Sequence, residues 1–383
     1  MHITNELLAS IFADSAAYCG KEDVLHAMIH HRLKKAGFPH ERIAREQALN
    51  NGRVDIVVYG DGVSGDFSST QKKPLASMEV KGGAYGNRNA LKDEIDASGY
   101  CNDMAKLKPE ATRGIESWFL CVDMPELGRA ISPLKAELVS EQCAAHGLAF
   151  AYYCQGEGKF LVSRPRQKLT TYPVTKATAA CCKSSVDFLF NRNDSKLAKF
   201  ARDCLAVNGH EANITARLYD CLRESGFGVA QLSLETYFSF AKQPGSRMQE
   251  RPDLVVFDAG FDGRFNLYKG GDSKRSNDPH KLAHISTIFE VKGGASMSKK
   301  GDKAVMQDYL ADIQKLNRWR EGAAKARSGT HVQTVFLGVD GRTSGLSTAA
   351  VETLVGESGK LGNGLIYINR NQLETVQPRL PAS

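Results

Sequence analysis

The sequence predicts an α/β protein made of two tandem domains, each a central mixed β-sheet flanked by helices. Three observations lead to this prediction. The hexapeptide MEVKGG at 78–83 recurs as FEVKGG at 289–294. Segments with the apolar spacing of an amphipathic helix alternate with short β-branched runs typical of buried strands. These segments follow one another in the same order around both hexapeptides, which indicates duplication of a whole domain.

The first repeated element is a helix. KEDVLHAMIHHRLKKAGF at 21–38 and HEANITARLYDCLRESGF at 210–227 both have helical apolar spacing and end in Gly-Phe. They align without a gap, so Glu22 falls on Glu211 and, farther along, Glu46 falls on Glu235.

Strands and helices then alternate in both copies. VDIVVYG and RPDLVVFD predict buried strands that align Asp55 with Asp253. After a variable polar loop, each hexapeptide forms the next strand. Helices containing NDMAKLK and ADIQKLN follow, then strands WFLCVD and VFLGVD, a further helix, and late strands AFAYYC and LIYIN. We therefore expect one domain over 1–165, a partly helical connector over 166–194, and a second domain over 195–383.

Composition limits the class of protein. A chain of 383 residues is longer than one hydrophobic core usually serves. No apolar run is long enough to span a bilayer, and the acid-containing N-terminus does not resemble a signal peptide. The nine cysteines contain no CxxC pair, so reduced thiols and a cytoplasmic location are expected. The net charge of +7 permits a polyanionic partner without requiring one.

The repeated residues suggest a chemistry. In Glu-x-Lys on a strand, Glu79 and Lys81 share one face and Val80 points into the core. If the two strands are hairpin neighbours, Asp55 approaches Glu79, and two close carboxylates repel unless a cation compensates. Mg²⁺ takes one or two carboxylates plus water and phosphate, and the lysine stabilises negative charge on a phosphate. The Gly-Gly after each lysine is expected to let backbone pass close to a bulky ligand.

This constellation resembles the PD-(D/E)xK nuclease superfamily, the fold of many restriction endonucleases. Its motif residues are Pro252, Asp253, Glu290 and Lys292 in the second copy and Asp55, Glu79 and Lys81 in the first, where Val54 replaces the proline. The resemblance implies metal-dependent phosphodiester hydrolysis, with Mg²⁺, or Mn²⁺ in its place, held by the Asp and Glu residues. It also implies that a helix acid, Glu22 or Glu211, completes each site.

The expected function is that of an endonuclease like the type II restriction enzymes. Two copies in one chain would cut the two strands of double-stranded DNA as a monomer with pseudo-twofold symmetry, in a restriction or bacterial defence role. Two alternatives stay open. One is a nucleic-acid-binding protein on a nuclease scaffold, with one or both sites inactive. The other is an RNA-directed or structure-specific nuclease.

Other polar residues have competing interpretations. Glu22 and Glu211 are equally well explained as partners of a helix dipole, and Glu46 and Glu235 are better explained as exposed strand residues than as ligands. Asp and Lys three apart on a helix form a surface ion pair by default, with phosphate contact by the lysine as the second interpretation. These pairs are Asp103–Lys106 and Asp312–Lys315, and Lys274 and Arg275 in a basic loop are the further candidates for nucleic-acid binding.

Overall fold

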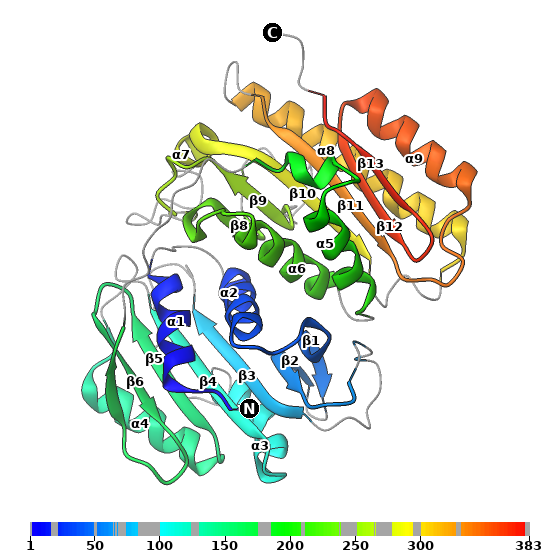
Figure 1. Cartoon of the computed structure of the whole chain (residues 1–383). Coiled ribbons are helices and arrows are strands. Elements are labelled where there is room, and N and C mark those ends of the chain that lie inside the picture. The colour runs from blue at the N-terminus through cyan, green and yellow to red at the C-terminus, as the bar shows by residue number, and fades with distance from the viewer. Residues whose placement is uncertain are drawn as a thin grey trace. The chain divides into compact units, whose positions relative to one another are not determined.

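A computed structural model describes most of the chain. The described residues are 2–16, 22–49, 52–63, 65, 67, 74–82, 100–123, 130–174, 185–207, 211–236, 238, 251–263, 265, 278–293, 300–326 and 331–379. The chain divides into two compact units, one comprising Met1–Ala179 and the other Ala180–Asn266 with Asp272–Ser383. Both are α/β, with a mixed sheet flanked by helices (Figure 1).

The first unit contains a seven-stranded sheet in the order β1-β2-β3-β4-β5-β6-β7. Strands β1 to β3 are antiparallel, β3 to β5 are parallel, and β5 to β7 are antiparallel again. Its elements are α1 (Asn5–Ser15), α2 (Glu22–Lys35), η1 (His40–Arg42), β1 (Ile43–Leu49), β2 (Gly52–Tyr59), β3 (Pro74–Gly82), α3 (Tyr100–Thr112), β4 (Glu116–Asp123), α4 (Pro133–Ala145), β5 (Ala149–Cys154), β6 (Lys159–Ser163) and β7 (Thr170–Pro173).

The second unit has a six-stranded sheet in which β8 to β13 lie in sequence order. Its pairings repeat those of the first sheet: antiparallel up to β10, parallel up to β12, then antiparallel. Its elements are η2 (Asp187–Phe190), α5 (Ser195–Leu205), α6 (Glu211–Glu224), η3 (Val229–Gln231), β8 (Leu232–Leu234), β9 (Leu254–Phe257), α7 (Asp278–His284), β10 (Ile285–Gly293), α8 (Asp302–Ala326), β11 (Gln333–Asp340), α9 (Thr348–Leu361), β12 (Gly364–Asn369) and β13 (Leu373–Val376).

The helices α2 and α6 begin and end where the sequence predicts. Each starts with a glutamate, whose charge favours the N-terminal end of the helix dipole. Each is followed by a glycine with positive φ, Gly37 at 94° and Gly226 at 103°. That conformation costs glycine little, so it stops the helix and turns the chain toward the first strand of the sheet.

The layers follow from side-chain alternation on β3. Gly82 faces Leu25 of α2. Lys81, one residue earlier, faces Asp103 of α3. Helices α2 and α3 therefore cover opposite faces of the sheet, and both packing layers meet at the end of β3.

The segment 166–194, expected to be a connector, contributes regular structure. Strand β7 within it pairs with β6 and widens the first sheet, and η2 precedes α5 in the second unit. Among the helices in the described ranges, none combines the length and apolar character needed to cross a bilayer.

Candidate active site in each unit

The first candidate site lies where β2 and β3 separate. Their last ladder pair is Ile56 with Met78, so the register sets Asp55 opposite Glu79. Beyond that pair the backbone N–H of Val80 has no strand partner on β2, and it donates instead to Asp55 Oδ2 at 2.8 Å. The aspartate thus replaces a ladder hydrogen bond and is held beside the buried glutamate.

The second unit repeats this arrangement. We call it the fork: the point where two paired strands separate and an Asp on one lies opposite a Glu on the other. Leu254 with Phe289 is the last pair of β9 and β10, which sets Asp253 opposite Glu290. The N–H of Val291 donates to Asp253 Oδ2 at 2.6 Å. Two segments far apart in the sequence therefore place an Asp and a Glu in the same geometry.

A helix acid joins each fork. Glu22, the first residue of α2, accepts a hydrogen bond from the N–H of Gly82 at 3.1 Å. Its Oε1 lies 3.7 Å from Lys81 Nζ. In the second unit the N–H of Gly293 donates to Glu211 Oε2 at 3.4 Å, and Lys292 Nζ lies 3.5 Å from the same oxygen. Both helix acids thus contact the motif lysine, beyond any effect on the helix dipole.

The expected surface ion pair on the next helix is part of the site instead. Lys106 Nζ lies 2.5 Å from Asp103 and also 3.5 Å from Glu79 Oε2, and Asp103 in turn lies 3.0 Å from Lys81 Nζ. In the second unit Lys315 contacts Glu290 and lies 3.2 Å from Asp312, which lies 3.6 Å from Lys292. The interpretation of Asp103–Lys106 and Asp312–Lys315 as isolated surface pairs is wrong, because α3 and α8 present these residues to the strand fork.

A longer repeat could have shown that these helix residues belong to the sites. The pattern Tyr-x-x-Asp-x-x-Lys-Leu occurs at 100–107 and again at 309–316. Tyr100 and Tyr309 are buried against the sheet, and the Asp and Lys follow one turn and two turns later. The buried tyrosine is the part of this motif that the comparison of NDMAKLK with ADIQKLN leaves out.

Burial and neighbouring charges raise the pKa of several of these acids. Burial, followed by the charge of Asp55, raises the pKa of Glu79 to about 9. Burial and then Asp253 raise the pKa of Glu290. Burial also raises the pKa of Glu22 and of Asp253 to about 7. Each site therefore holds carboxyl groups whose ionised form a bound cation would favour.

The donor set fits a divalent cation. Each network contains four carboxyl groups and two lysines, so full ionisation leaves two negative charges uncompensated within it. Neither carboxylate oxygen of Glu79 accepts a hydrogen bond, nor does Glu290 Oε2. Buried carboxylate oxygens without donors are ligands available to a hard cation such as Mg²⁺.

The first glycine after each lysine has a packing role. A Cβ on Gly82 would lie 2.5 Å from Leu25 Cδ1 and 2.9 Å from the Val122 carbonyl oxygen. A Cβ on Gly293 would lie 2.4 Å from the Val339 carbonyl oxygen. These glycines let the helix and the neighbouring strand approach β3 and β10, a packing role that the sequence pattern does not predict. Their role in ligand approach stays a prediction. The second glycines, Gly83 and Gly294, lie outside the described residues.

Glu46 and Glu235 share an unusual backbone. Their φ angles are 48° and 52°, in the left-handed region that non-glycine residues rarely adopt. Each lies beside the fork aspartate on the neighbouring strand and pairs with an arginine, Arg53 at 3.3 Å or Arg251 at 3.2 Å. The two residues are thus more constrained than simple exposed strand positions.

Of the sequence-predicted residues, the structure brings together, within each unit separately, the motif trio, the helix acid and the helix lysine. Lys274 and Arg275 lie outside the described residues. Neither the family models nor the curated proteins compared with this chain include a match to it.

Proposed function

We propose that this chain is a divalent-metal-dependent endonuclease in which each unit hydrolyses one phosphodiester bond. One observation carries the proposal: two sheets with the same pairing order over six strands hold the same charged network at the same fork. Its members are Glu22, Asp55, Glu79, Lys81, Asp103 and Lys106 in the first unit and Glu211, Asp253, Glu290, Lys292, Asp312 and Lys315 in the second.

The Asp and Glu of each fork would hold Mg²⁺, or Mn²⁺ in its place. When bound, such an ion polarises a phosphate oxygen and lowers the pKa of a coordinated water. Lys81 and Lys292 stay cationic, because nearby carboxylates raise their pKa against the lowering effect of burial. Their ammonium groups then supply positive charge where a scissile phosphate would enter.

The second lysine of each network has a related role. Lys106 and Lys315 contact the buried glutamates in the metal-free protein. Once a cation neutralises those carboxylates, the ammonium groups are free to contact phosphate. This assigns both lysines to nucleic-acid binding close to the metal.

Double-stranded DNA, with one site for each strand, is the favoured substrate. A restriction or defence role is proposed by analogy with restriction endonucleases alone. The restriction-endonuclease-like identity of the fold and a pseudo-twofold relation between the units stay predictions. A binding protein on a nuclease scaffold is the second candidate. It is less favoured because a binding protein has no need for an intact acid and lysine network in both units.

Plasmid cleavage tests this proposal. We expect the wild-type chain with Mg²⁺ to linearise supercoiled plasmid, and Lys81→Ala and Lys292→Ala each to accumulate open circles. Removing one lysine takes charge stabilisation from one scissile phosphate, a rate loss of about 10²–10³ at that site. The double variant should leave the plasmid supercoiled while still binding it in a gel-shift assay.

Lys360→Ala is the matched control, since this lysine is 72% exposed on α9 and lies outside both networks. It should cut as the wild type does. If one single variant abolishes all cutting while the other has no effect, only one unit is catalytic. Binding without cleavage of plasmid, single-stranded DNA or RNA under any metal condition would favour the binding protein, and cleavage of RNA alone would reassign the substrate.

A further inference from the structure

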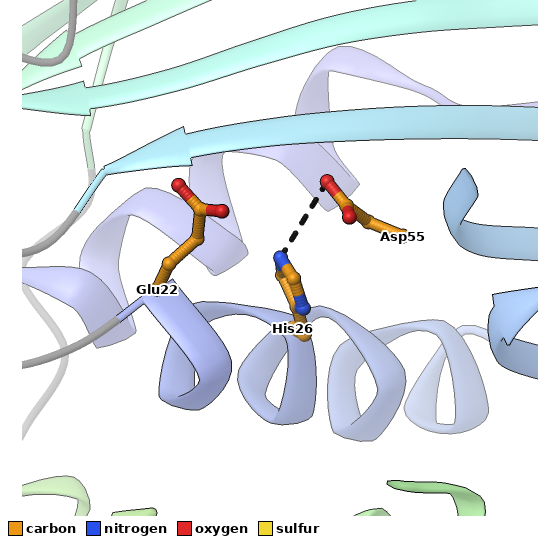
Figure 2. Close-up of side chains that lie close together, drawn as sticks. All are labelled: Glu22, His26 and Asp55. Carbon is orange, nitrogen blue, oxygen red and sulfur yellow. Dashed lines mark ion pairs between the residues drawn. The ribbon is translucent and has the colours of Figure 1, made fainter. Parts of the chain in front are cut away.

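The first unit has a histidine beside its fork. Glu22 and His26 are one helical turn apart on α2, so they share a face, and Asp55 points toward them from β2 (Figure 2). One ligand atom from each of the three lies within 4.8 Å of the other two. Two ligands of one ion lie at most about 4.4 Å apart when each bond is about 2.2 Å long. Small side-chain movements would therefore bring all three onto one ion.

One ring nitrogen of this histidine makes no hydrogen bond. His26 is only 5% exposed, and its Nε2 makes no hydrogen bond. Asp55 Oδ2 lies 3.6 Å from it, too far for a hydrogen bond. A buried polar atom without a partner costs free energy. A cation among these side chains would satisfy the nitrogen and the carboxylates together.

The other ring nitrogen determines the proton's position. His26 Nδ1 lies 3.5 Å from Arg45 Nη2, and an arginine can only donate. In the metal-free protein Nδ1 therefore offers its lone pair and Nε2 carries the proton. Coordination through Nε2 would require this proton on Nδ1, and Arg45 would then donate to the Asp23 carbonyl oxygen, from which its Nη2 already lies 3.5 Å.

The second unit differs at both positions. The ungapped alignment of α2 with α6 puts Thr215 where the first unit has His26, and Leu234 where it has Arg45. The hydroxyl of Thr215 donates to the backbone oxygen of Glu211 at 3.2 Å and so turns back on its own helix. The carboxylates are thus common to both units, whereas the imidazole and the guanidinium behind it belong to one.

We propose that the first unit binds a divalent transition-metal ion through Glu22, His26 and Asp55, while the second unit binds Mg²⁺ through oxygen ligands alone. Imidazole nitrogen favours first-row transition metals, and Mg²⁺ prefers a shell of oxygens. The inference refines the metal dependence proposed above and does not require cleavage. The two units would then draw on different ions.

Metal binding to the full chain tests this without substrate. Calorimetry of the metal-stripped protein with Mn²⁺ should find one site that keeps its ion in a hundredfold excess of Mg²⁺. Pulsed electron paramagnetic resonance of that bound Mn²⁺ should show coupling to an imidazole nitrogen. Because this measurement uses the wild-type chain, it does not depend on whether a variant folds.

His26→Thr copies the second unit's residue and should weaken Mn²⁺ binding at least about tenfold while leaving Mg²⁺ binding unchanged. Thr215→Ala, at the equivalent position, should leave the selective site intact. Mn²⁺ bound without nitrogen coupling, two sites with equal selectivity, or no binding to the free protein would each overturn the inference. A selective Mn²⁺ site in a chain that cuts no nucleic acid would instead sustain it and refute the proposed nuclease function.

Discussion

The two units share a fork and differ in the contacts that its aspartate and glutamate make. Glu290 accepts a hydrogen bond from Lys315, whereas Glu79 has Lys106 at 3.5 Å and accepts none. The first unit instead has His26 beside its aspartate. Both units therefore keep the fork acids and the motif lysine. They differ in the lysine contact of the glutamate and in the histidine, which only the first unit has at this position.

The largest expected difference concerns the glycine after the lysine. A Cβ on Gly293 would meet the Val339 carbonyl oxygen at 2.4 Å, and backbone cannot move aside cheaply. A Cβ on Gly82 meets the flexible end of Leu25 first, at 2.5 Å. We expect Gly293→Ala to lower the free energy of unfolding by about 3 kcal/mol and Gly82→Ala by about 1–2 kcal/mol.

Urea-induced unfolding followed by circular dichroism measures both changes. Gly356→Ala is the control, because a Cβ on this α9 glycine meets nothing within 4 Å and alanine favours a helix. Equal losses at Gly82 and Gly293 would mean that the helix contact matters as much as the backbone one. No loss at either would leave ligand approach as the role of these glycines.

The second prediction concerns how the stability of the folded protein depends on pH through Glu79. The pKa of Glu79 is about 9 in the folded chain and 4.5 when unperturbed. Below pH 4.5 both states hold the proton, so the group has no effect. Between pH 4.5 and 9 the unfolded state ionises more readily, so the metal-free protein loses stability as the pH rises. Glu79→Gln never ionises and should therefore stabilise it by about 2 kcal/mol at pH 8, given about 1.4 kcal/mol per pKa unit and partial relaxation.

Thermal unfolding in EDTA at pH 4 and pH 8 measures this gain, which should be absent at the lower pH. Glu290→Gln should gain less, because its amide oxygen accepts the hydrogen bond from Lys315 without the charge that strengthens it. With Mg²⁺ the wild type should instead be more stable to heat than either variant, since it keeps the carboxylate that binds the ion. Greater stability of the wild type over Glu79→Gln in EDTA at pH 8 would show that the carboxylate is satisfied without metal.

The sequence predicts those parts of the fold that have local patterns repeated in both copies. Helices α2 and α6 have periodic apolar residues and a glycine stop, and the strand that carries Asp55 is a short β-branched run. The strand that carries Glu79 is marked by the repeated hexapeptide. Duplication supplies the internal comparison that one sequence otherwise lacks. The opposition of Asp55 and Glu79 then follows from hairpin pairing alone.

What the sequence does not predict depends on contacts between elements. Lys106 has the spacing of an ordinary surface pair, and only the packing of α3 on β3 brings it to Glu79. The role of Gly82 depends on the close approach of Leu25 and β4, which no local pattern records. Strand β7, in the polar segment TTYP, forms because β6 offers it an edge.

The smallest expected effect concerns the left-handed glutamates. Glu46 has φ of 48°, which costs a non-glycine residue roughly 1–2 kcal/mol, and its ion pair with Arg53, itself 59% exposed, returns at most about 1 kcal/mol. Glu46→Gly should remove the strain and Glu46→Ala should keep it. The glycine variant should thus be more stable than the alanine variant by about 1 kcal/mol in urea unfolding.

At Glu235 the same order is expected, with a larger loss for alanine because Arg251 is only 37% exposed and the pair is better shielded from water. Alanine variants as stable as the glycine ones would mean that the chain relaxes out of the left-handed region, and the shared strain would no longer be a property of the fork.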